Sequence, residues 1–192
     1  KGGHRKFYYG TFRKFEKPRI HREGRRSVYR AVRRFEGRGP EPHHLRGGKG
    51  MRIQCRGKAQ TTQGFDYYSH GIYIDNIKAS FITSDGIETY CAYDVHIGTI
   101  EATDVGGCGV LLNCSRDVEI LSINALRCCT ARSEGTAGGY AAFRCANDVG
   151  PNIKVHHVYG AESGRGMFFV SSDTGIDIDE IELVDNASQG IL

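Results

Sequence analysis

Short runs of alternating hydrophobic and polar residues recur along the chain, separated by polar turns that contain glycine. Aligned on the glycine that opens most of them, the runs form two columns. The first column is GMRIQC at 50–55, GIETYC at 86–91, GVLLNC at 109–114, YAAFRC at 140–145 and GMFFVS at 166–171. The second column is IYIDNIKA at 72–79, VHIGTIEA at 95–102, VEILSINA at 118–125, IKVHHVYG at 153–160 and IDIDEIEL at 176–183. Alternation with a period of two predicts a β-strand for each run.

The spacing of the units predicts a solenoid. Gly86 and Gly109 are 23 residues apart, and Gly166 and Gly190 are 24 residues apart. Coils of this length stack at the interstrand distance of about 4.8 Å and share one core. We therefore predict an all-β fold, a single-stranded parallel β-helix of about five coils over residues 49–192. Because the chain ends at Leu192 inside what reads as another first strand, we expect further coils beyond it.

The sixth position of the first column predicts an interior file of cysteines. It is occupied by Cys55, Cys91, Cys114, Cys145 and then Ser171. Alternation places this position on the same face as small and apolar residues, so we expect the thiols to line the core. Disulfides between neighbouring coils are a weaker alternative. A metal centre is weaker still, because one stacked column does not form a tetrahedral cage.

Three aspartates recur three places after the cysteine, in AYDV, SRDV and ANDV. They are Asp94, Asp117 and Asp148. Each lies where the chain turns between two strands, and Asp side chains commonly hydrogen-bond the backbone of their own turn. We interpret them as a ladder that stabilises the turns.

Charge is distributed unevenly along the chain. Residues 1–58 hold 19 Lys and Arg but only four acidic residues, whereas residues 59–192 have a net charge of −11. We predict a basic N-terminal arm or cap over residues 1–48, with a short basic helix over 22–39 that ends near Gly37. Its Arg, Lys, Phe and Tyr also suit nucleic acid, but no nucleic-acid-binding fold is recognisable, so an arm or cap is favoured. No apolar run reaches the roughly 18 residues of a membrane span.

The coil pattern resembles the right-handed parallel β-helix proteins of the pectate-lyase-like superfamily. The resemblance covers residues 49–192 and rests on GVLLNCSRDVEI, CANDVGPNIKV and GRGMFFVSSDTGIDIDEI. It implies a right-handed solenoid, a secreted or cell-surface location, and activity on acidic or neutral polysaccharides at the outside of one sheet. Calcium as a cofactor is implied by the resemblance alone. The sequence has no Asp-Asp pair and no GHG motif, which argues against hydrolysis of the polygalacturonase type.

The outward positions of the first column form a polar strip with one aromatic residue. We assign catalytic roles to Arg144, Arg165, Asp148 and Glu88, and substrate-binding roles to Tyr90, Asn113, Phe168, Arg132 and His156. β-Elimination from a uronate needs a base, an acid and cations that neutralise the carboxylate. Hydrolysis needs two carboxylates, and Glu88 has no evident partner, so elimination is favoured. Arg132 belongs to the inserted loop 126–139, which we expect to wall this sheet.

His156 lies in the second column, where we expect its side chain to point outward. Asp177, Asp179, Glu180 and Glu182 follow one coil later on the same sheet. Pairing between histidine and carboxylate across coils is one interpretation, and a solvated surface is the other.

These observations predict a carbohydrate-active protein, either a uronate lyase or a glycoside hydrolase, whose partner is a polysaccharide, in particular an anionic one. Two alternatives stay open. One is a non-catalytic glycan-binding or adhesive module, because no complete acid/base pair is present. The other is association with nucleic acid through the basic arm. The chain starts at Lys1, so either a leader has been removed or the sequence is an internal piece.

Overall fold

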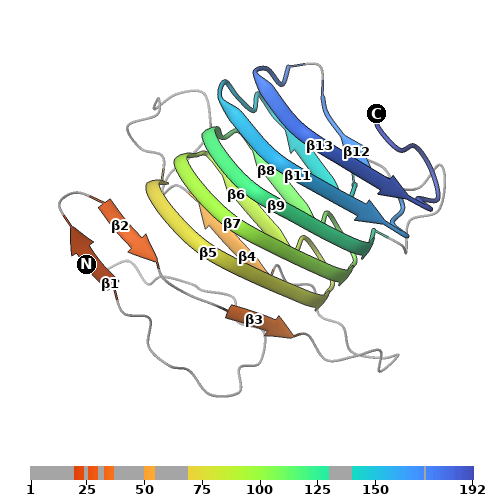
Figure 1. Ribbon diagram of the computed structural model, residues 1–192, viewed down its shortest axis with the longest axis horizontal. Coiled ribbons are helices and arrows are strands. Elements are labelled where there is room, and N and C mark those ends of the chain that lie inside the picture. The colour runs from red at the N-terminus through yellow and green to blue at the C-terminus, as the bar shows by residue number, and fades with distance from the viewer. Residues whose placement is uncertain are drawn as a thin grey trace, which may run out of the picture.

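The strands wind into a parallel β-solenoid of about five turns, as the computed structural model in Figure 1 shows. The structure describes residues 20–23, 26–29, 33–36, 50–54, 69–129, 140–170 and 172–192. All regular secondary structure in these ranges is β-strand. None of the described residues belongs to a helix with the length and apolarity that crossing a bilayer requires. The predicted all-β solenoid is confirmed.

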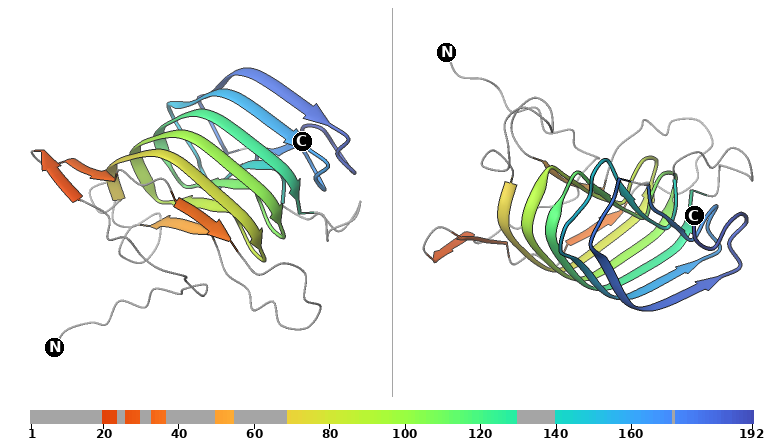
Figure 2. Two further views of the ribbon diagram at one scale, coloured as in Figure 1. Left: turned by 60° about the horizontal axis from the view of Figure 1, so that its bottom comes forward. Right: turned by 90° about the horizontal axis from the view of Figure 1, so that it is seen from above.

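The long sheet is formed by long, curved strands that lie side by side (Figures 1 and 2). Its main strands are β5 (Ser69–Ile82), β7 (Ala92–Val105), β9 (Arg116–Cys128), β11 (Ile153–Ala161) and β13 (Ile176–Val184). Neighbouring members pair in parallel, and the paired residues occupy equivalent places in successive coils. Each run of the second column lies inside one of these strands, as the alternation predicted.

The short sheet faces the long sheet across the core. Its strands are β4 (Met51–Gln54), β6 (Ile87–Tyr90), β8 (Val110–Asn113), β10 (Phe143–Ala146) and β12 (Met167–Phe168). They pair in parallel in the same order as the coils. Each coil therefore contributes one strand to each sheet.

Three short strands continue the long sheet at its N-terminal edge, β1 (Ile20–Glu23), β2 (Arg26–Tyr29) and β3 (Arg33–Glu36). Strands β2 and β3 both pair with β5, and β1 pairs antiparallel with β2. The basic helix expected over 22–39 is therefore wrong. Val28, Tyr29 and Phe35 have high β-propensity, and an open sheet edge offers their backbone hydrogen-bonding partners.

The corners of the long sheet are made by residues with positive φ. One stack of equivalent positions consists of Gly71, Asp94, Asp117, Asn152 and Gly175, with φ between 50° and 65°. Asp, Asn and Gly tolerate this left-handed conformation best. The expected turn position is thus confirmed for Asp94 and Asp117. In the next coil the stacked residue is Asn152 and not Asp148, and its Nδ2 donates a hydrogen bond to Asp117 Oδ1 at 2.7 Å.

The core consists of stacked apolar columns. Ile77, Ile100, Ile123 and Val158 form one column of the long sheet, and all four are buried. The glycines that open the first-column units let neighbouring coils approach each other. A Cβ added at Gly86 would lie 2.6 Å from the carbonyl oxygen of Gly109. Glycine is therefore needed at Gly86 for this close approach, whereas the equivalent position of the fourth coil is Ala142.

The cysteines do not form one interior file, so that prediction is wrong. Phe143 pairs with Val110, and Cys145 therefore stacks beside Leu112 inside the main core. Cys91 and Cys114 form a separate cluster with Tyr90 and Tyr93. Both cysteines have positive φ, 50° and 47°, which breaks the alternation of faces at this corner. Cys55 and Ser171 lie outside the described residues.

All six described cysteines are nevertheless buried, and no disulfide joins any of them. Burial and the nearby Asp85 carboxylate raise the pKa of Cys108 to about 12. Burial likewise raises the pKa of Cys128 and of Cys145. These three thiols stay protonated at neutral pH, so they act as small apolar side chains and not as nucleophiles.

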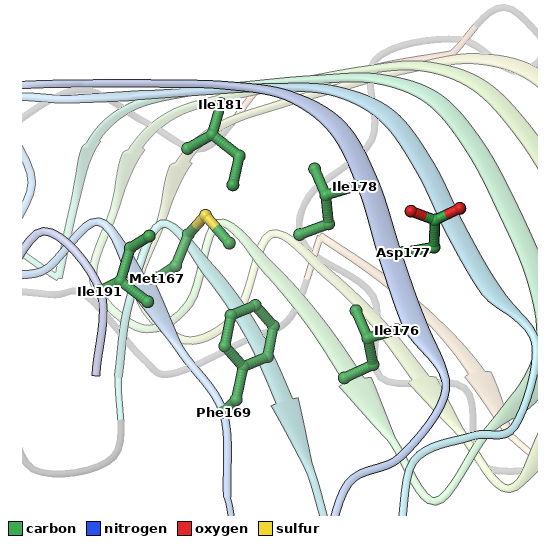
Figure 3. Close-up of a pocket in the computed structure, with 7 residues that line it drawn as sticks. All are labelled: Met167, Phe169, Ile176, Asp177, Ile178, Ile181 and Ile191. Carbon is green, nitrogen blue, oxygen red and sulfur yellow. The ribbon is translucent and has the colours of Figure 1, made fainter.

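The interior of the last coil is open at its end. The hollow there is lined by Met167, Phe169, Ile176, Ile178, Ile181 and Ile191, with Asp177 at its rim (Figure 3). Ile176 and Ile178 point into it, whereas Asp177 points to the outer side of β13. This contrast shows the alternation that separates the core face of the long sheet from its outer face.

Candidate functional site

The polar strip expected on the short sheet is largely buried. Glu88 exposes 3% of its surface, Leu111 7% and Asn113 9%, although alternation directs Glu88 and Leu111 away from the main core. Cys108, Leu111 and Ala146 form an apolar cluster with Tyr140 and Val170 on this side of the sheet. The part of the strip that contains Glu88, Leu111 and Asn113 is therefore covered by other side chains and does not form an open groove.

The two predicted catalytic arginines come together around one aromatic ring. The guanidinium carbons of Arg144 and Arg165 each lie 5.1 Å from the centre of the Phe168 ring. Arg165 is buried, and its Nε donates a hydrogen bond to Gln189 Oε1 at 2.9 Å. Cation–π contacts of this kind hold a guanidinium in place. The structure thus forms an Arg–Phe cluster from Arg144, Arg165 and Phe168.

The remaining predicted residues do not join this cluster. Glu88 is separated from Arg144 by the intervening strand β8, a distance of roughly 9–10 Å between backbones. Asp148 is exposed at a turn, and Tyr90 packs against Cys91 and Cys114.

Asn113 also has a structural role, because its Oδ1 accepts a hydrogen bond from Asn147 Nδ2 at 2.8 Å. Arg132 lies outside the described residues. Of the nine predicted site residues, His156 is placed on the other sheet, where it takes part in a second polar constellation.

That constellation crosses the outer face of the long sheet. We call it the His–carboxylate ladder, and it consists of Asp94, His96, Glu119, His156, Asp179, Lys154 and Asp177. Strands β7, β9, β11 and β13 supply its members, so it spans four successive coils. Period-two alternation and the corner residues turn all of these side chains toward solvent.

The contacts of the ladder are short and continuous. His96 Nδ1 lies 2.9 Å from Glu119 Oε2, and His96 Nε2 lies 3.2 Å from Asp94 Oδ1. His156 Nε2 lies 3.3 Å from Glu119 Oε1, and His156 Nδ1 lies 2.7 Å from Asp179 Oδ2. Glu119 therefore connects the two imidazoles through its two oxygens.

Lys154 completes the ladder at the C-terminal end. Its Nζ donates a hydrogen bond to Asp177 Oδ2 at 2.7 Å and a second one to Asp179. Hydrogen bonds that Lys154 donates to Asp177 and then to Asp179 raise the pKa of Lys154. Hydrogen bonds from Lys154 and then from His156 lower the pKa of Asp179.

The two histidines and Glu119 influence one another in the same way. Hydrogen bonds to Glu119 and then to Asp179 raise the pKa of His156. Hydrogen bonds from His96 and then from His156 lower the pKa of Glu119. Solvent screens these effects, because the side chains of His156 and Glu119 are 40% and 44% exposed.

Aromatic rings stack along the solenoid axis beside the ladder. Tyr73 and His96 lie 4.7 Å apart between ring centres, with planes 5° from parallel. His70 and Tyr93 lie 4.8 Å apart, and the guanidinium carbon of Arg116 lies 5.4 Å from the Tyr93 ring centre. We call these two columns the ring stacks. Stacking orients the tyrosine hydroxyls and the imidazole nitrogens of these rings beside the carboxylates.

His156 and Asp179 were predicted from the sequence, whereas His96, Glu119 and the ring stacks were not. The signal was present in the second column. Its second position reads Tyr73, His96, Glu119, Lys154 and Asp177 in successive units. Stacking of equivalent positions turns such a column into a line of contacts.

In the described ranges, no group of three or more His, Cys, Asp or Glu residues is arranged to hold a metal ion. Comparison with known proteins adds no assignment. No protein-family model matches the chain, and neither the curated proteins nor the solved structures include a match. The fold is that of a parallel β-solenoid, and its functional interpretation rests on the geometry above.

Proposed function

We propose that the protein is a carbohydrate-active β-solenoid that binds a polysaccharide along the outer face of its long sheet. The observation that carries this proposal is the pair of ring stacks beside the His–carboxylate ladder. Carboxylate oxygens accept hydrogen bonds from sugar hydroxyls, and aromatic side chains offer apolar contact with sugar C–H groups.

The regular spacing of the coils suits a polymer better than a small molecule. Equivalent groups repeat at about 4.8 Å along the solenoid, so an extended chain meets several of them in turn. Many weak contacts then add up, as they do in other multivalent interactions.

The charge of this face favours a neutral polysaccharide over the anionic one expected from the sequence. The ladder contains four carboxylates, and Glu180 and Glu182 are exposed on β13 nearby. A uronate would meet these like charges, and close like-charge contacts cost binding free energy. The extracellular location implied by the resemblance accompanies this proposal.

Affinity electrophoresis with neutral glucans and xylans, and with pectate and alginate, tests the proposal. We expect a neutral polysaccharide to retard the protein, and Tyr93→Ala to weaken its affinity about tenfold or more, as for an aromatic hot spot. Tyr159→Ala is the matched control, because Tyr159 lies on the same sheet outside the ring stacks. Absence of binding to every polysaccharide, or equal losses in both variants, would contradict the proposal.

A second candidate function is β-elimination from a uronate at the Arg–Phe cluster. Two guanidiniums at 5.1 Å from one ring could neutralise a uronate carboxylate, which that reaction requires. The test is the absorbance of the unsaturated product on incubation with pectate or alginate. We expect Arg144→Met to abolish any such product, and product formation that survives this substitution would exclude the cluster as the site.

A further inference from the structure

Every ring nitrogen of the two ladder histidines faces a carboxylate oxygen. The four distances lie between 2.7 and 3.3 Å, within hydrogen-bonding range. His96 faces Asp94 and Glu119, and His156 faces Glu119 and Asp179. This arrangement limits which protonation state of the imidazoles satisfies all four contacts.

A neutral imidazole has one N–H donor and one acceptor nitrogen. An ionised carboxylate can only accept. If His156 were neutral, one of its nitrogens would direct a lone pair at Asp179 or Glu119, and the contact would be repulsive. Four attractive contacts therefore require two protons on each ring.

The charges around the two imidazole rings also favour the doubly protonated state. Strand β7 contributes Asp94, β9 contributes Glu119, β11 contributes Lys154, and β13 contributes Asp177 and Asp179. Strand β5 contributes Tyr73, which stacks on the His96 ring. With both imidazoles charged, the ladder carries one excess negative charge, whereas neutral imidazoles would leave three. Loss of the protons would thus set like charges against one another on neighbouring coils.

The pKa shifts define where this arrangement is strongest. The pKa of His156 is raised above its ordinary 6.5, so its contribution to stability is complete below pH 6.5 and is lost as pH rises through the raised pKa. The pKa values of Glu119 and Asp179 are lowered from 4.5 and 3.8, so their contributions are present above these values and are lost in acid. The window of greatest stabilisation is therefore about pH 4.5–6.5.

We propose that the His–carboxylate ladder is a proton-loaded clamp, in which two doubly protonated imidazoles tie strands β7, β9, β11 and β13 together on the outer face of the long sheet. Release of the His156 proton at higher pH removes contacts between the coils and loosens this face. The inference goes beyond the proposed function, because it requires no ligand.

Nuclear magnetic resonance of the histidine ring nitrogens tests the clamp directly. We expect the ring of His156 to be doubly protonated at pH 6 and to lose its proton at a higher pH than an ordinary histidine side chain. Asp179→Asn and Glu119→Gln should each lower the titration midpoint of His156, by about one pH unit. An unchanged midpoint in both variants would overturn the proposal.

Thermal unfolding between pH 5.5 and 8.5 provides the second readout. We expect the melting temperature of the unmodified protein to fall across this range by about 2–4 °C more than that of His156→Gln. His157→Gln is the matched control, because the His157 ring Nδ1 lies 3.4 Å from the Ser122 hydroxyl and takes no part in the His–carboxylate ladder. It should keep the pH dependence of the unmodified protein. The same pH dependence in His156→Gln would show that the ladder does not act as a clamp.

Discussion

The two sheets of the solenoid are built from the same coils, but their outer faces differ in burial. On the short sheet, Glu88 and Leu111 expose only 3% and 7% of their surface. On the long sheet, the side chains of His156 and Asp179 expose 40% and 48%. Both faces carry charged residues, so composition does not distinguish them. Burial decides which charged groups remain available to a ligand and which mainly stabilise the fold.

The comparison also separates two kinds of polar contact. Asp85 is buried beside the entry to the short sheet, and its Oδ1 accepts a hydrogen bond from the backbone N–H of Cys108 at 2.9 Å. Asp104 lies at a partly exposed corner of the long sheet, where its two oxygens accept hydrogen bonds from Arg127 at 2.7 and 3.1 Å. The two contacts differ in what their loss would cost. Water can replace the partner in the contact between Asp104 and Arg127, but it cannot reach the buried contact between Asp85 and Cys108.

The largest effect is expected for a pair of leucine substitutions that compares core and surface. Leu112 in β8 is fully buried, whereas Leu121 in β9 is 54% exposed. Leu112→Ala should lower the free energy of unfolding by about 2–5 kcal/mol. Leu121→Ala should change it by no more than about 0.5 kcal/mol. Urea denaturation measures both, and similar losses would show that core and surface positions are not distinguished as described.

An intermediate effect is expected at Asp85. Asp85→Ala leaves the buried N–H of Cys108 without this acceptor, which should cost about 1.5–3 kcal/mol of unfolding free energy. Asp85→Asn keeps an oxygen at the same position and is the matched control. Urea denaturation should place the control close to the unmodified protein. If both variants lose the same free energy, the carboxylate charge and not the hydrogen bond is responsible.

The smallest effect is expected at the partly exposed ion pair of Asp104 and Arg127. Asp104→Asn should cost less than about 1 kcal/mol, because Arg127 is 39% exposed and solvent screens the pair. Asparagine tolerates the positive φ of 55° at this position, so the backbone should be unaffected. Denaturation at low and at high salt checks this, and the difference should shrink in high salt. A large loss that salt does not change would contradict this interpretation of the corner.

Part of the candidate site could be predicted from the sequence. Alternation identified the outward direction of His156 and Phe168, and the aspartate-rich run at 176–183 suggested a partner for His156. The sequence did not indicate that the strip containing Glu88 and Asn113 would be buried. Burial depends on which distant segments pack over a face, and the sequence of a single strand does not indicate those segments.

The repeat alone determined the parallel solenoid, the two strand columns and the coil length, because period-two alternation and a fixed spacing leave few ways to stack short strands. It did not determine the register of the fourth unit. Ala142, and not Tyr140, is equivalent to Gly109, and a shift of two residues leaves every side chain on the same face. Tertiary structure also decided the separation of Cys91 and Cys114 from Cys145, since left-handed corner residues interrupt the alternation. The ladder itself required both levels: the sequence supplied the charged residues, and the stacking of coils brought residues more than 20 positions apart into hydrogen-bonding distance.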